Sequence, residues 1–222
     1  MQEYVKSISP GVEFSIVVLV AFGYFIVGSI LSLLLPHSTG MPITQSHLFF
    51  LMIYEPIVVF ILWKFLSLRG WNLKQIGFSP DLYDSMVGVG LFVITYLVNF
   101  FVLIIFVPFS QGIYDQVTNM VEPNLGLSTV LAVSVINPIF EEVFVCGYIV
   151  TALKKFRSVT FAINVSIAIR LAYHLYQGVI GVISIVPLGF LFTYWFARTG
   201  RIWPLIVAHG IFDYFGLVAY VK

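Results

Sequence analysis

Charged side chains are scarce in this sequence. Asp, Glu, Lys and Arg make up only 9% of the 222 residues, whereas a soluble domain carries about 25%. Hydrophobic residues account for 60% of the chain, and the mean hydropathy is +1.02. A water-soluble surface cannot be built from this supply. The composition therefore predicts an integral membrane protein.

The sequence also lacks a second cysteine, a basic cluster and a linker. Its single cysteine, Cys146, excludes an internal disulfide. The formal net charge is +1, and lysines and arginines are scattered, so we expect no binding to nucleic acid. No Pro/Gly/Ser-rich tract divides the chain, and no internal repeat is visible. We therefore expect one integral membrane domain over residues 1–222, and a transporter is disfavoured.

Long apolar segments dominate the rest of the chain. A helix needs about 20 apolar residues to cross ~30 Å of hydrocarbon. Windows of roughly this kind cover residues 12–35, 46–66, 84–109, 128–153, 159–177, 179–197 and 202–221. The first is too long for the apolar core of a signal peptide, so we expect it to be retained. The predicted fold is all-α, a polytopic membrane helix bundle with about seven transmembrane helices.

Basic residues gather in every second connection between these windows. Nine of the eleven therefore lie on the same side of the membrane as the N-terminus, namely Lys6, Lys64, Arg69, Lys74, Lys154, Lys155, Arg157, Arg198 and Arg201. The 36–45 and 110–127 loops contain neither lysine nor arginine. Because lysine and arginine accumulate in cytoplasmic loops, we predict a cytoplasmic N-terminus, an outer C-terminus and outer positions for these two loops.

Several ionisable side chains lie inside the apolar windows. A charge at the bilayer centre costs at least ~2.5 kcal/mol, so each one needs a partner, a wet cavity or a function. These residues are Glu55, Glu141, Glu142, Arg170, His174, His209 and Asp213. Glu55 precedes Pro56, which loosens the second helix. We interpret Glu55 as structural or interfacial.

Two adjacent acids, Glu141 and Glu142, lie near the middle of the fourth window, just after Pro138. Adjacent side chains leave a helix about 100° apart, so only one of the two can point squarely into a given cavity. The other must find a separate partner. Considered alone, the pair could equally consist of buried acids that are neutralised by burial or by basic neighbours.

Two further pairs repeat a spacing of four residues, which puts both members on one helix face. They are Arg170 with His174, and His209 with Asp213. A single buried histidine is more often a satisfied core residue than a catalytic one. Together with the glutamates, however, these residues provide a carboxylate that can take a proton from water and an imidazole that can protonate a leaving amine. We therefore predict an active or binding site between the helices.

Three ordered segments resemble the motifs of a known family. They are Asn137–Tyr148 (NPIFEEVFVCGY), Arg170–Gly178 (RLAYHLYQG) and Ala208–Asp213 (AHGIFD). In this order they resemble the CAAX-protease and bacteriocin-processing (Abi) family of glutamic intramembrane proteases. Leu68–Phe78 (LRGWNLKQIGF) resembles the loop that precedes the family core. The likeness covers about residues 68–215.

The resemblance implies roles for individual residues. Glu141 would be the general base that activates water, and His174 would assist it or shuttle protons. His209 and Asp213 would hold the substrate carbonyl and the developing oxyanion. The implied protein needs no cofactor, lies in the plasma membrane of a prokaryote, and acts on a membrane-associated peptide or protein within the lipid bilayer.

The chain departs from the family pattern in two places. Cys146 replaces the arginine that follows the second glutamate by four residues, and Asp213 replaces a frequent asparagine. An ionised aspartate cannot donate a hydrogen bond, so Asp213 would have to orient His209 or be protonated. The missing arginine would have met Glu142 on the same helix face. Because a guanidinium in hydrocarbon must meet an anion, we predict that Arg170 pairs with Glu142 instead.

Ideal upright helices would not bring the candidates to one depth. With a rise of 1.5 Å per residue, Glu141 would lie ~18 Å deep, His209 ~12 Å and His174 ~24 Å. Helix tilt, a kink at Pro138 and unwinding over residues 176–178 would have to close this gap.

Three functions remain open from the sequence. The first is an intramembrane endopeptidase that uses Glu141-activated water. The second is a proteolytically inactive scaffold or regulator of the same fold, which loss of the motif arginine would favour. The third is a zinc-dependent protease with two histidines and a carboxylate as ligands, although no H-E-x-x-H pattern supports it.

Overall fold

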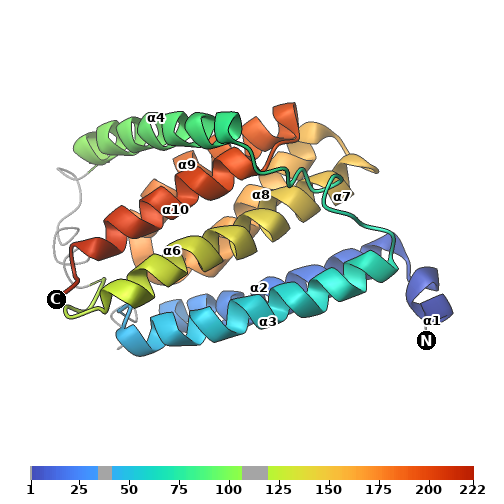
Figure 1. Cartoon of the computed structure of the whole chain (residues 1–222), viewed down its shortest axis with the longest axis horizontal. Helices are drawn as coiled ribbons and strands as arrows, with labels where there is room; N and C mark the ends of the chain where they lie inside the picture. Colours follow the sequence, from blue (N-terminus) through green and yellow to red (C-terminus); the bar gives the residue numbers. More distant parts are fainter. Residues whose placement is uncertain (1, 35–41, 107–119) are drawn as a thin grey trace.

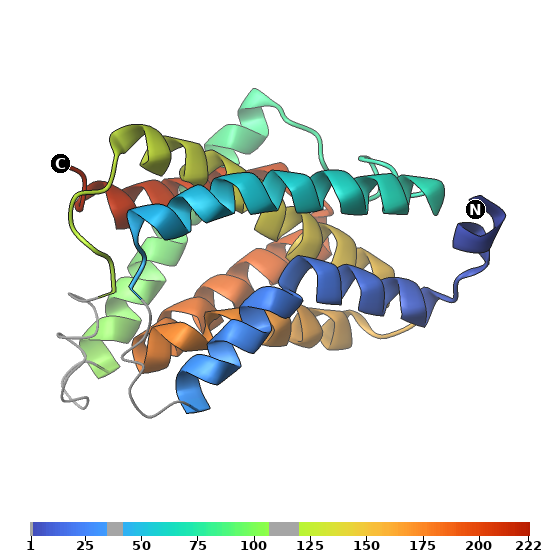
Figure 2. The ribbon, with the colours of Figure 1, turned by 90° about the horizontal axis from the view of Figure 1, so that it is seen from below.

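The computed structural model describes residues 2–34, 42–106 and 120–222. These residues form helices without a β-strand, and two isolated bridges join Ile43 to Val121 and Leu125 to Val221. The helices are α1 (Gln2–Ser7), α2 (Pro10–Leu34), α3 (Gln45–Leu68), α4 (Leu82–Phe106), α6 (Leu127–Glu142), η2 (Val143–Val150), α7 (Thr151–Lys154), α8 (Val159–His174), η3 (Leu175–Gln177), α9 (Gly178–Thr199) and α10 (Trp203–Val218). Figures 1 and 2 show them as one elongated bundle. The all-α prediction is confirmed.

Among the described residues, six helical segments are long and apolar enough to cross a membrane. They are Pro10–Leu34, Gln45–Leu68, Leu82–Phe106, Leu127–Lys154, Val159–Gln177 and Gly181–Thr199. The seventh predicted window is helix α10, which is apolar but only 16 residues long. At 1.5 Å per residue it extends ~24 Å, less than the ~30 Å of hydrocarbon. The ends of two predicted windows, residues 35 and 107–109, lie outside the described residues.

Helix α6 and its continuation η2 run through the centre of the bundle (Figure 1). Every residue from Phe140 to Val150 is buried. Helices α3 and α10 pack against α6, whereas α8 and α9 pack against η2. Large apolar side chains on α2, α3 and α4 point outward instead. This distribution fits a bundle whose outer surface is covered by lipid.

Nine of the eleven basic residues belong to segments at the end of the bundle that holds the N-terminus, and the C-terminus lies at the opposite end (Figure 1). Buried acids hold some of these basic residues in place. Arg69 Nε lies 2.6 Å from Glu13 Oε2, and Arg201 Nη1 lies 2.6 Å from Asp84 Oδ1. The predicted orientation in the membrane stays a prediction. Residues 36–41 and 110–119 of the two predicted outer loops lie outside the described residues.

Three departures from regular α-helix surround the polar centre. Pro138 lies inside α6, and the chain continues from Glu142 directly into the π-helix η2. Helix α8 ends at His174 and passes into the 3-10 turn η3, which Gly178 closes with φ +65°. The sequence indicated the proline and the unwinding near Gly178, but it gave no sign of the π-helix. Such π segments occur often at functional sites.

Candidate active site

A cavity of about 260 Å³ lies between α2, α3, α6, α8, η3 and α10. Its walls include the predicted catalytic residues Glu141, His174, His209 and Asp213. The two supporting residues, Glu142 and Arg170, are buried behind this wall. The fold therefore brings residues from α6, α8 and α10 to one cavity, despite their different depths in ideal helices.

Arg170 pairs with Glu142, as the sequence predicted. Arg170 Nη2 lies 2.8 Å from both Glu142 Oε1 and Glu142 Oε2, and the two side chains are almost inaccessible. The same nitrogen lies 3.9 Å from Cys146 Sγ. The guanidinium of Arg170, from α8, thus lies close to Cys146 of η2, the position at which the resemblance implied an arginine.

Only one carboxylate oxygen of Glu141, which lines the cavity, is held by hydrogen bonds. Tyr173 Oη donates to Glu141 Oε2 over 2.7 Å, and Arg170 Nη1 donates to the same oxygen over 3.4 Å. Glu141 Oε1 accepts no hydrogen bond from the part of the chain that the structure describes. This oxygen is the atom that a water in the cavity can meet. The guanidinium therefore contacts Glu141 in addition to the predicted partner, Glu142.

Tyr173 is a site residue that sequence reasoning missed. Its ring stacks on Phe22 at a centroid distance of 4.9 Å, and Ser29 Oγ donates to its backbone carbonyl over 2.8 Å. Helix α2 thereby fixes the tyrosine that orients Glu141. The sequence feature that could have identified Tyr173 is its hydroxyl group, which precedes His174 inside the apolar window 159–177.

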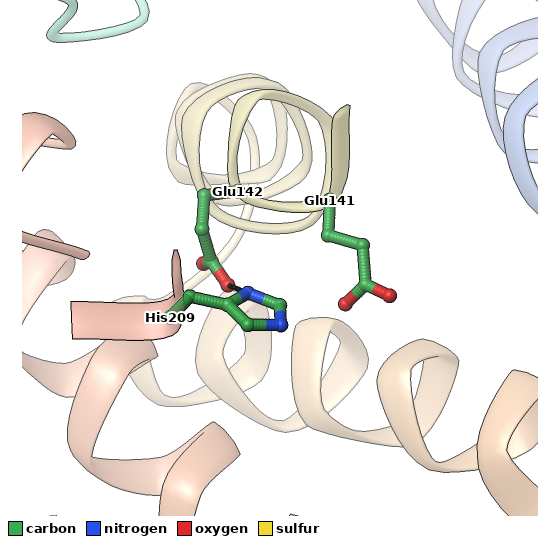
Figure 3. A group of neighbouring side chains, drawn as sticks. All are labelled: Glu141, Glu142 and His209. Atoms are coloured by element: carbon green, nitrogen blue, oxygen red, sulfur yellow. Dashed lines mark hydrogen bonds and ion pairs between the residues drawn. The ribbon is translucent and has the colours of Figure 1, made fainter. Parts of the chain in front are cut away.

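His209 lies between two carboxylates. Its Nδ1 is 2.8 Å from Glu142 Oε1, a contact marked in Figure 3, and its Nε2 is 3.5 Å from Asp213 Oδ1. Asn137 Nδ2 donates to Asp213 Oδ2 over 3.0 Å. Asp213 therefore faces His209, which fits the orienting role given to it. The longer contact at Nε2 marks this nitrogen as the one that a substrate oxygen can reach.

The ring of His174 has one nitrogen committed to the backbone. Its Nδ1 lies 2.9 Å from the carbonyl oxygen of Arg170. A carbonyl only accepts, so Nδ1 carries the hydrogen and Nε2 keeps its lone pair. His174 lines the cavity. This tautomer suits a residue that receives a proton.

Glu55, which we interpreted from the sequence as structural or interfacial, also belongs to the site. Its side chain is only 1% exposed and forms part of the cavity wall. His47, Tyr176 and Gln177 also line the cavity and were not expected there. The sequence did mark Glu55 as unusual, since it is the only acidic residue in the apolar window 46–66. Its position depends on how α3 packs against α6, which the sequence does not reveal.

One group of side chains in the described part of the chain could hold a metal ion. Glu141, Glu142 and His209 each offer a ligand atom, and these atoms lie within 4.8 Å of one another. Figure 3 shows the three side chains together. This set has one histidine and two carboxylates, unlike the two histidines and one carboxylate that we expected for zinc. The guanidinium of Arg170 already lies against both carboxylates and would have to move for coordination.

Comparison with known proteins relates this site to a protease family. Residues 123–215 match the family model described as type II CAAX prenyl endopeptidase Rce1-like. No curated protein and no solved structure matches the chain. The matched segment contains all the predicted site residues and less than half of the 222 residues.

The match and the apolar helices together define the class of protein. Six candidate spans and a membrane protease family make the chain a multi-pass membrane protein related to hydrolases. Residues 123–215, which contain the paired glutamates and the two histidine motifs, are thus similar to the CAAX protease family that their motifs resemble.

Proposed function

We propose that this protein is a glutamic-type intramembrane endopeptidase that hydrolyses a peptide bond of a membrane-associated peptide or protein. One observation carries the proposal. Glu141 is fixed through Oε2 by Tyr173 and Arg170, while its Oε1 remains available at the cavity. A positioned carboxylate of this kind is what a general base requires.

The reaction begins with a water molecule held at Glu141 Oε1. Glu141 takes a proton as the water oxygen attacks the substrate carbonyl, which becomes a tetrahedral oxyanion. His209 Nε2, placed between the cavity and Asp213, donates to this oxyanion. His174 Nε2 carries the proton from Glu141 to the leaving amine. The C–N bond then breaks, which releases an acid and an amine without an acyl-enzyme.

Glu142 has a supporting role in this scheme. It accepts from Arg170 Nη2 and contacts His209 Nδ1, so it links the cation to the imidazole. Glu142 is inaccessible to water. Its function is to position His209, whereas the function of Glu141 is chemical. The two adjacent acids therefore divide their roles, as the 100° angle between their side chains suggested.

The experiment compares Glu141→Gln with the wild-type chain. Membrane peptides from cells that express each form should differ by products that only the wild type releases. In purified protein, the variant should lose roughly 10²- to 10⁴-fold in cleavage rate, the usual contribution of a general base. Glu122→Gln is the matched control, because Glu122 is exposed and lies outside the cavity.

Two alternatives make different predictions. A scaffold or regulator of the same fold would show no products, and its cellular effect would survive Glu141→Gln. A zinc protease would lose activity in a chelator and regain it with Zn²⁺, and metal analysis of the purified protein would find the ion. The grouping of Glu141, Glu142 and His209 is the observation that keeps the zinc alternative in the test.

A further inference from the structure

A carboxylate on α3 lines the cavity, and one of its oxygens has no hydrogen-bond partner among the described residues. Glu55 is 1% exposed and lines the cavity, and its Oε2 forms no hydrogen bond with the residues that the structure describes. Helix α3 lies outside the matched residues 123–215. Burying a carboxylate without a partner is costly. Its place in the wall therefore points to a ligand group that completes it.

The lysines and arginines of this chain do not supply that group. All eleven lie in described segments, and none forms an ion pair with Glu55. Arg170, the cation nearest the site, faces Glu141 and Glu142 instead. Glu55 is thus left without a countercharge from these residues.

The cavity wall contains three acidic side chains and three histidines. Glu55, Glu141 and Asp213 line the cavity, and the lining residues include neither lysine nor arginine. The same wall also contains apolar side chains, among them Phe25, Leu48 and Leu51. Such a wall fits a group with an apolar stem and a cationic end, because the stem packs on hydrocarbon while the charge meets the carboxylate.

We propose that Glu55 forms a subsite for a lysine or arginine side chain of the substrate, next to the bond that is cleaved. This inference rests on the proposed peptidase function. Glu55 and Glu141 share the cavity wall, so a peptide bound at Glu141 presents a neighbouring side chain to Glu55. The charge-assisted hydrogen bond between the two groups then selects basic peptides.

The test uses the full chain in lipid vesicles and pairs of fluorogenic peptides. The members of a pair differ at one position, where one has lysine and the other has norleucine, which keeps the apolar stem without the charge. At the position next to the cleaved bond, the wild type should prefer lysine in kcat/KM roughly tenfold to a hundredfold, the range for a hydrogen bond to a charged group. Glu55→Gln should bring this ratio close to one.

Glu122→Gln removes an exposed carboxylate and should keep the wild-type ratio. Glu55→Asp keeps the charge and should retain part of the preference, which separates charge from a general defect in packing. The subsite is refuted if wild type shows no lysine preference at any position, or if Glu55→Gln keeps the preference in full.

A binding measurement separates this inference from the proposed function. If the wild type cleaves none of the peptides, fluorescence anisotropy on the Glu141→Gln protein follows their binding instead. Weaker binding of the lysine peptide in the Glu141→Gln/Glu55→Gln double variant would support the subsite and count against the peptidase. Equal binding of both peptides to both variants would overturn the subsite.

Discussion

One cation organises the acids of this site. Arg170 contacts Glu142 through Nη2 and Glu141 through Nη1, and it is itself only 1% exposed. Burying a guanidinium or a carboxylate costs desolvation free energy, and this cost is offset only when the opposite charges are paired. The replacement of the motif arginine by Cys146 therefore does not remove the countercharge from the site, because α8 supplies it. This favours the peptidase over the inactive scaffold.

Arg170→Leu should be strongly destabilising. The substitution leaves Glu142 buried without its cation, and breaking a buried pair in this way costs ~3–5 kcal/mol. The double variant Arg170→Leu/Cys146→Arg should recover more than half of this loss, because Cys146 Sγ is only 3.9 Å from the guanidinium nitrogen. Thermal and denaturant unfolding in detergent micelles measures both changes.

Arg198→Leu is the control for this series, since Arg198 is exposed at the end of α9. It should leave the unfolding midpoint unchanged. An Arg170→Leu protein that unfolds and cleaves like wild type would show that the pair has no such role.

At the scale of elements, the approach of α10 to α6 builds the site. A Cβ placed on Gly210 would lie 2.6 Å from the carbonyl oxygen of Ser134, so only glycine permits this distance. The neighbouring residue, His209, reaches Glu142 across the same contact. The π-helix η2 starts one residue after Glu142, and Pro138 lies one turn before it. These features fix where the imidazole meets the acids.

Gly210→Ala should push α10 away from α6 and misplace His209. A misplacement of about 1 Å can cost a hundredfold in rate, and we expect a loss of roughly this size in kcat. Gly90→Ala on α4 is the control, because a Cβ there meets nothing within 4 Å and Gly90 does not line the cavity. Cleavage assays and melting curves of both variants decide the point. Wild-type rates in Gly210→Ala would contradict the packing argument.

At the scale of the whole molecule, charge predicts the orientation. Nine of the eleven basic residues gather at the N-terminal end of the bundle, which predicts that this end is cytoplasmic. The cavity wall includes Ile43, Val121 and Leu217, which lie toward the C-terminal end. Together these observations predict that the substrate bond approaches from the outer side of the membrane.

A cysteine introduced at Lys74 tests this orientation, because Lys74 is exposed and the only native cysteine, Cys146, is buried. A membrane-impermeant maleimide should label Lys74→Cys in opened membranes and leave it unlabelled in intact cells. A reporter fused after Lys222 should in turn read as outer. Labelling of Lys74→Cys in intact cells, or a cytoplasmic reading at Lys222, would reverse the topology.

The sequence alone determined the class of this protein and one of its contacts. Hydropathy is a sum over residues, so the membrane helices followed without knowledge of the packing. The contact between Arg170 and Glu142 followed because a charge in hydrocarbon must meet its opposite, and few carboxylates were available. The motifs likewise placed Glu141, His174 and His209 on separate helices, and the structure brought them to one cavity.

The tertiary structure decided the rest. The hydroxyl of Tyr173 on Glu141, the contact of Asn137 with Asp213 and the place of Glu55 in the cavity all depend on how neighbouring helices are rotated and spaced. Rotation and spacing arise from close packing of side chains along the whole interface, and a local pattern of residues does not contain them. The sequence therefore shows that a buried charge needs a partner, while packing selects which residue that partner is.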